Sequence, residues 1–140
     1  MQLTKRTDYA FRALIYLASM NQDLTNIQRL ADDFSLSKSH LMKIVNELVR
    51  HGWVEAVRGK YGGIRLGVEP ESISVKDVVV LMEPNLEPVN CMEPPCVIYR
   101  PCILKGVLRD ARDSYLDYLA NYTVADLLDN KTTRALRFSP

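Results

Sequence analysis

The sequence lacks any long hydrophobic run, and no apolar stretch approaches the roughly 20 residues that a membrane-spanning helix needs. It also lacks the apolar segment of a signal peptide, because Lys5, Arg6 and Asp8 fall where that segment would begin. We therefore expect no membrane partner and a cytoplasmic location, where thiols are kept reduced.

Catalytic motifs are missing as well. The chain contains no Walker, HExxH or Ser/His/Asp nucleophile pattern, and an enzyme is therefore the class that we expect least. Its 140 residues, 47% hydrophobic and 25% charged, suit one soluble domain with a dimerising appendage.

A net charge of one sign is almost absent, since the formal charge is only +1. That value is the sum of two unlike parts. Residues 1–66 hold ten Lys and Arg against six Asp and Glu, which gives +4, and residues 67–140 hold eight against eleven, which gives −3. This asymmetry predicts a basic binding surface in the first part of the chain.

Hydrophobic spacing predicts three short helices at the start. Apolar residues recur at helical spacing from Tyr9 to Met20, and again from Ile27 to Phe34, after Thr25 as the expected cap. A third helix is expected to begin at Ser37, whose hydroxyl can accept a backbone N–H, and to end at Gly52.

The rest of the chain predicts a hairpin and more helices. Residues 53–66 alternate around a glycine-rich centre as a two-stranded hairpin does. Helix, turn, helix and hairpin in this order indicate a winged helix-turn-helix. Further helices are expected from Ser74 to Met82, over a long segment from 104 to 122, and from 124 to 128 after a Thr123 cap.

A DNA-binding surface is indicated by the third helix and the hairpin. A recognition helix needs short polar or basic side chains at its groove-facing end, and a basic, glycine-rich wing can grip a phosphate or enter a minor groove. The candidates are Ser37, Lys38, Ser39, His40 and Lys43 on the helix, and Arg58, Lys60 and Tyr61 on the wing. The alternative is an ordinary solvated surface.

Cysteine is scarce, and all three residues, Cys91, Cys96 and Cys102, fall within twelve positions. An odd number of cysteines does not suit a simple disulfide framework. The spacing lacks the CxxC knuckles of a closed zinc site, although soft thiolates suit iron–sulfur clusters, zinc and copper(I). We interpret the group as three ligands of a cluster whose fourth ligand comes from elsewhere; three cysteines without metal are the alternative.

The long helix carries one apolar stripe, which we predict to be a dimer interface: Leu104, Val107, Leu108, Ala111, Tyr115, Tyr118, Leu119 and Tyr122. Packing within one subunit is the alternative. The fold is therefore predicted to be mainly α: a winged helix-turn-helix DNA-binding domain with a two-stranded wing (1–82), a cysteine- and proline-rich cluster-binding loop (83–101), and a dimerisation helix with a C-terminal segment (102–140).

Several motifs resemble one family. These are Thr7-Asp8-Tyr9-Ala10 at a helix start, the wing from Arg58 to Gly67, Asn90-Cys91 with Cys96 and Pro101-Cys102, and the tail from Asn121 to Leu128. To about Leu128 the chain resembles the NsrR-type repressors, which belong with IscR to the iron–sulfur winged-helix regulators.

The resemblance implies a homodimer with one iron–sulfur cluster in each subunit. Such a protein binds double-stranded operator DNA, represses genes for nitric oxide detoxification, and releases DNA when nitric oxide nitrosylates the cluster. It implies that Cys91, Cys96 and Cys102 are ligands and that Asp8 of the partner subunit is a possible fourth ligand; a charge at a helix N-terminus is the alternative for Asp8.

Two departures refine the resemblance. Lys105 stands where IscR-like proteins have a histidine ligand, so a 4Fe-4S cluster is favoured over 2Fe-2S. Met42 replaces a recognition-helix glutamate of IscR-like proteins, so a different operator is expected, while Arg58 matches the family's wing arginine.

We hypothesise that the cluster state sets the spacing of two recognition helices. Iron–sulfur supply sensing, a metal-free thiol switch, and a metal or cluster carrier module remain open.

Overall fold

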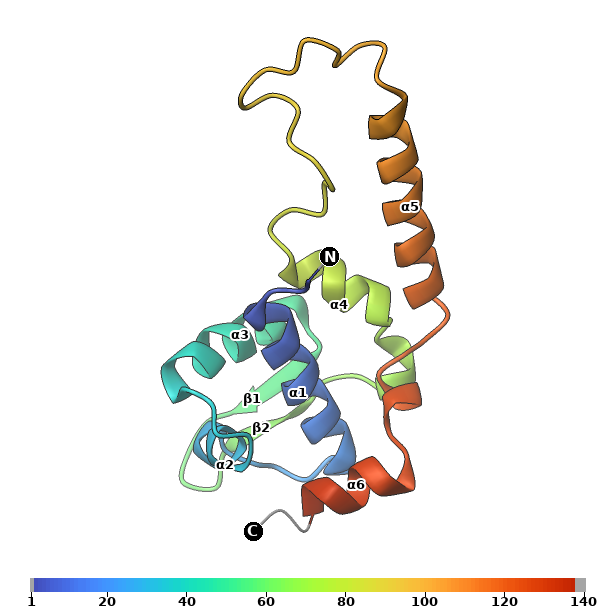
Figure 1. Ribbon diagram of the computed structural model, residues 1–140. Helices are drawn as coiled ribbons and strands as arrows, with labels where there is room; N and C mark the ends of the chain where they lie inside the picture. The colour runs from blue at the N-terminus through green and yellow to red at the C-terminus, as the bar shows by residue number, and fades with distance from the viewer. Residues whose placement is uncertain (1, 138–140) are drawn as a thin grey trace.

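A computed structural model describes residues 2–137 of the chain (Figure 1). Its helices and strands are α1 (Lys5–Ser19), α2 (Ile27–Asp33), α3 (Lys38–His51), β1 (Val54–Val57), β2 (Gly63–Leu66), α4 (Val75–Met82), α5 (Ile103–Leu119) and α6 (Asn130–Arg137), with short 3-10 turns η1 (Pro70–Ser72) and η2 (Ala125–Leu127). The expected fold, mainly helical with a two-stranded wing, is confirmed.

The starts of α2 and α3 differ from the sequence prediction in how they are capped. Asn26, not Thr25, caps α2, and its side chain accepts the Arg29 N–H at 2.8 Å. Ser37 is the N-cap residue of α3, but it makes no capping bond, because its hydroxyl lies 3.0 Å from the Ser39 hydroxyl instead. The predicted caps at Thr25 and Ser37 are therefore wrong in residue and in bonding, respectively.

The end of α3 follows the sequence pattern. Gly52 is its C-cap with a left-handed φ of 90°, a conformation that costs glycine little, and its N–H donates to the Val49 carbonyl at 3.0 Å. This reversal sends the chain directly into β1, so α3 and the wing are in contact.

The wing is hydrogen-bonded to the loop before α2. Strands β1 and β2 pair antiparallel, with Val54 opposite Leu66 and Val57 opposite Gly63. Thr25 then exchanges two backbone hydrogen bonds with Ile64, at 3.0 and 2.7 Å. Because this pairing buries Thr25, it explains why this threonine is not free to cap α2.

One hydrophobic core holds α1–α4 and the wing together. Its fully buried members include Leu14 and Leu17 of α1, Leu48 of α3 and Val78 of α4. Val124, far along the chain, joins the same core and is also fully buried. The segment after α5 therefore returns to the core formed by α1–α4 and the wing.

The remaining residues project from this core as an arm, which we define as residues 83–119. Figure 1 shows the cysteine- and proline-rich segment leaving α4, turning at the top of the view and running back along α5. No residue of α5 is buried in the single chain. Within the described range, residues 2–137, no helix is long and apolar enough to cross a membrane.

The C-terminal part departs from the sequence prediction. The helix expected over 124–128 is a single 3-10 turn, and the Thr123 N–H and hydroxyl both donate to Asp126 Oδ2, at 2.7 and 2.9 Å. Helix α6 was not predicted from the sequence. Its Leu136 packs on the core beside α1, where α6 lies next to the C-terminal end of α1 (Figure 1).

Candidate DNA-binding surface and cysteine loop

The predicted groove-facing residues of α3 all lie on the surface. Leu41, Ile44, Val45 and Leu48 anchor one side of the helix in the core. The opposite side presents the five predicted residues, which are all exposed: Ser37, Lys38, Ser39, His40 and Lys43. A helix fixed on one face with short polar side chains at its free N-terminal end suits entry into a major groove.

The wing tip is equally accessible. Arg58, Lys60 and Tyr61 are exposed, and the Tyr61 side chain reaches 84% exposure. Lys60 Nζ lies 5.7 Å from the centre of the Tyr61 ring, so the tip combines a cation with an aromatic face. The DNA-binding role of these eight residues stays a prediction.

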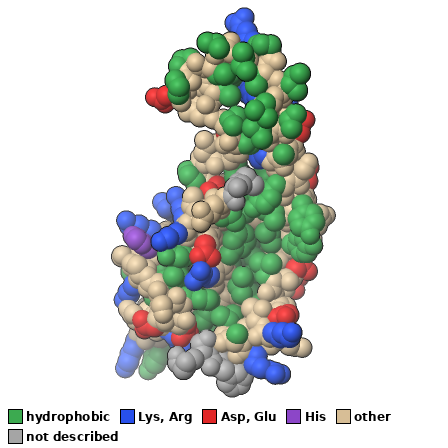
Figure 2. Space-filling model, in the orientation of Figure 1, with side chains coloured by type: hydrophobic (Ala, Val, Ile, Leu, Met, Phe, Trp, Pro, Cys, Tyr) green, Lys and Arg blue, Asp and Glu red, His purple; other side chains and the backbone are tan. Residues whose placement is uncertain are grey.

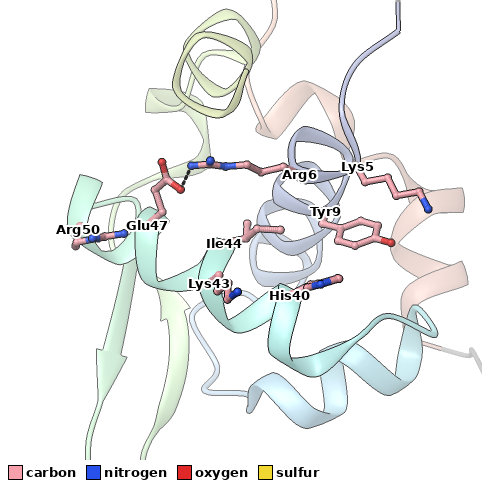
Figure 3. Close-up of a pocket in the computed structure, with 8 residues that line it drawn as sticks. All are labelled: Lys5, Arg6, Tyr9, His40, Lys43, Ile44, Glu47 and Arg50. Atoms are coloured by element: carbon pink, nitrogen blue, oxygen red, sulfur yellow. Dashed lines mark hydrogen bonds and ion pairs between the residues drawn. The ribbon is translucent and has the colours of Figure 1, made fainter. Parts of the chain in front are cut away.

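A basic hollow next to α3 was missed by sequence reasoning. It lies between the start of α1 and α3, and Figure 3 shows its lining residues: Lys5, Arg6, Tyr9, His40, Lys43, Ile44, Glu47 and Arg50. Arg6 forms an ion pair with Glu47 across the two helices. The available signal was the Lys5-Arg6 pair together with Arg50 two turns after Lys43, but only the packing of α1 on α3 brings them together.

The cysteine loop begins as a tight turn. The Cys96 N–H donates to the Cys91 carbonyl at 3.0 Å, and the Tyr99 N–H donates to the Cys96 carbonyl at 3.1 Å. Cys102 is the N-cap residue of α5, and its thiol makes no capping bond.

All three thiols are free of disulfides, and Cys96 is exposed. As donors, three soft thiolates on one loop fit an iron–sulfur cluster. Within residues 2–137, however, no three His, Cys, Asp or Glu side chains are grouped closely enough to hold a metal ion. The chain thus supplies suitable donors without gathering them by itself.

Asp8 does not lie with the cysteines. It sits in the first turn of α1, where its carboxylate accepts a hydrogen bond from Arg12 Nε at 3.1 Å and pairs with Arg12 Nη2 at 2.8 Å. Within one chain this is the charge at a helix N-terminus that the alternative reading describes. A ligand role toward a partner subunit stays a prediction.

Glu83, the first residue of the arm, is tied to α1. Its Oε1 accepts hydrogen bonds from the Thr4 N–H at 2.8 Å, the Thr4 hydroxyl at 3.1 Å and the Thr7 hydroxyl. Burial raises the pKa of the Glu83 carboxyl, but these three bonds outweigh burial and hold the pKa below its ordinary value. The arm therefore starts from a fixed anionic contact at the N-terminus of α1.

The predicted dimer stripe of α5 is divided between two sides. Leu108, Tyr115 and Leu119 are half-buried, and α5 contacts α4. The other members are exposed: Leu104, Val107, Ala111, Tyr118 and Tyr122. The half-buried residues fit packing within one subunit, and the exposed residues fit a dimer interface. The role of the stripe as a dimer interface stays a prediction.

Comparison with known families decides the class of protein. Residues 3–130 match the family described as "Rrf2: Iron-dependent Transcriptional regulator". The chain belongs to the Rrf2 family. As a member of the Rrf2 family it is a DNA-binding transcriptional regulator and not an enzyme. This assignment supports the winged helix-turn-helix reading of α2, α3 and the hairpin.

Solved structures share the fold over most of the chain. The oxidized form of Staphylococcus aureus CymR is 28% identical, with 93% of this chain and 100% of that chain covered and a TM-score of 0.74. CymR of B. subtilis, named as its global cysteine regulator, is 26% identical, with 91% and 95% covered and a TM-score of 0.71. T. potens IscR is 24% identical, with 91% and 85% covered and a TM-score of 0.74, a likeness of fold.

Proposed function

We propose that this Rrf2-family protein is a homodimeric repressor that senses nitric oxide through an iron–sulfur cluster bound at the arm. The observation that carries the proposal is the placement of three free thiols, Cys91, Cys96 and Cys102, on one loop that leads into a helix with no buried residue. The cluster, when bound, supplies iron that reacts with nitric oxide.

Several features of the arm support a role outside the folded core. Residues 92–101 are exposed, and the side chain of Val97 is 99% exposed. Figure 2 shows a concentration of hydrophobic side chains at the projecting end of the molecule. Such a surface is costly in water unless another subunit covers it, and the exposed members of the α5 stripe continue it.

The contacts of the arm offer a route from the thiols to DNA. Glu83 fixes the first residue of the arm to Thr4 and Thr7 at the start of α1. Arg6, in the same turn of α1, pairs with Glu47 of α3. A change in loop position would therefore bear on the recognition helix, and in a dimer on the spacing between two such helices. A coupling of about 1–3 kcal/mol changes affinity about 5- to 150-fold.

The test is anaerobic purification followed by iron and sulfide analysis and gel-shift assays. The account expects iron and acid-labile sulfide, and operator binding that nitric oxide abolishes. The Cys96→Ala variant is expected to lose the cluster and the response to nitric oxide. A variant that still binds operator DNA and still releases it on exposure to nitric oxide would remove the cluster from the mechanism.

A second candidate, a thiol switch without metal, has its own support. Cys96 is exposed and no cysteine is in a disulfide, so oxidation chemistry has access to the loop. The CymR relatives, one of them named as a global cysteine regulator and one solved in an oxidized form, add weight to it. Purified protein without iron or zinc, whose DNA binding responds to a disulfide-forming oxidant, would favour this candidate.

A further inference from the structure

The hollow between α1 and α3 is an open basic depression of about 540 Å³. Two helices that are distant in sequence contribute its cations, Lys5 and Arg6 from α1, and Lys43 and Arg50 from α3. In Figure 3 Arg6 reaches from α1 toward Glu47 of α3, Lys43 and Arg50 project from α3, and the Lys5 side chain extends away from α3. In Figure 2 Lys and Arg side chains gather around a histidine on the left of the view.

The charges in the hollow are not balanced. Glu47 is its only carboxylate, and it pairs with Arg6. Among the residues that the structure describes, Lys5, Lys43 and Arg50 have no acidic side chain within 4.0 Å. Four cations against one carboxylate leave an excess of three positive charges, which repel one another unless an anion is present.

The hollow adjoins the groove-facing side of the recognition helix. Lys43 belongs to both, because it is one of the predicted DNA contacts and also lines the hollow. Arg50 follows two turns later, about 10 Å along α3 at 1.5 Å per residue. A phosphate row at the edge of a major groove runs alongside an inserted helix, so cations along one side of that helix can reach phosphates.

We infer that this hollow is a phosphate clamp for the DNA backbone beside the groove that α3 enters. The inference rests on the proposed DNA-binding function and extends it to α1. Lys5 and Arg50 supply free donors, and Glu47 holds the Arg6 guanidinium in place. Contacts of this kind add affinity and fix orientation but do not distinguish bases.

The test compares a double variant with a matched control. Lys5→Gln/Arg50→Gln removes two charges from the hollow, and Lys131→Gln/Arg134→Gln removes two exposed charges from α6, at the far end of α1 (Figure 1). The full-length wild type first selects a binding duplex from a random pool. Affinity for that duplex and for an unrelated duplex is then measured against salt concentration, and circular dichroism and thermal unfolding check that each variant is folded.

The clamp predicts that the Lys5/Arg50 variant binds both duplexes more weakly by a similar factor. The slope of log affinity against log salt is negative, and each lost phosphate contact makes it shallower by about 0.9. The salt dependence of the variant should therefore be shallower by about 2 for each bound subunit. The α6 variant should keep the wild-type slope. Equal slopes in both variants, or a loss confined to the selected duplex, would overturn the clamp.

The same data separate this inference from the proposed function. If the wild type selects no duplex and shows no salt-dependent binding, DNA binding itself fails and the clamp fails with it. If the wild type binds and the Lys5/Arg50 variant matches it, only the clamp fails.

Discussion

The packed region around α1–α4 and the projecting arm differ in what holds them in place. Within the described chain, every buried hydrophobic residue except Val124 lies between Ala10 and Met82. In the arm, residues 92–101 are exposed and no residue of α5 is fully buried. The packed region thus has its own hydrophobic core, whereas the arm carries three free thiols and has no fully buried hydrophobic residue. This difference suits the roles proposed for them, DNA binding for the packed region and sensing for the arm.

Replacing one glycine in each region by alanine should give the largest difference in the free energy of unfolding. A Cβ at Gly63 would lie 2.4 Å from the Thr25 carbonyl oxygen, where the wing meets the loop before α2, whereas a Cβ at Gly106 in α5 meets nothing within 4 Å. Overpacking against backbone predicts that Gly63→Ala lowers the free energy of unfolding by about 3 kcal/mol. Gly106→Ala should be neutral or stabilise by up to about 1 kcal/mol, since alanine favours helix. Urea unfolding measures both, and equal effects would contradict the comparison.

One substitution made in both regions gives the next largest effect. Val78 of α4 is fully buried and Val97 of the arm is 99% exposed. Val78→Ala should cost about 2 kcal/mol, from lost burial and the cavity left behind. Val97→Ala should change the free energy of unfolding by less than about 0.5 kcal/mol. A comparable loss at Val97 would mean that the arm is packed in solution.

The contact between the two regions should respond to pH. Because the pKa of Glu83 is lowered in the folded chain, its contribution is complete above the pKa of the unfolded chain and is lost as pH falls through the folded value. Glu83→Gln should therefore cost about 1 kcal/mol at neutral pH, from weakened charge-assisted hydrogen bonds, and the cost should shrink in acid.

Glu87→Gln is the matched control for that prediction. Glu87 lies four residues into the arm and pairs with Arg112 on an exposed surface, so its replacement should have little effect at any pH. Chemical unfolding at a series of pH values measures both variants. A Glu83→Gln cost that stays constant, or grows, toward low pH would show that Glu83 is not anionic in this contact.

The sequence was sufficient where local pattern and packing agree. Helical spacing and the Gly52 stop located α3, and the glycine-rich alternation located the wing. Capping was less predictable, because Thr25 and Asn26 are both competent caps and a distant partner, Ile64, occupies the backbone of Thr25. Helix α6 was missed because its sequence is mostly polar, and its contact with the core through Leu136 is visible only in the folded chain.

The candidate site divides in the same way. The exposed residues of α3 and the wing follow from one helix and one hairpin, so periodicity places them. The basic hollow depends on the packing of α1 against α3, which joins Lys5 to Arg50 across 45 positions of the sequence. For the cysteines, spacing nominates the donors, but within residues 2–137 no three such side chains are grouped closely enough to hold a metal ion.

The most direct test of the account is an anaerobic titration of the purified protein with nitric oxide that follows visible absorbance and operator binding together. The account predicts that the absorbance of the cluster changes and that DNA is released over the same range of added nitric oxide. Complete DNA release without a change in absorbance, or a full change in absorbance with DNA still bound, would contradict the claim that the arm controls the DNA-binding region.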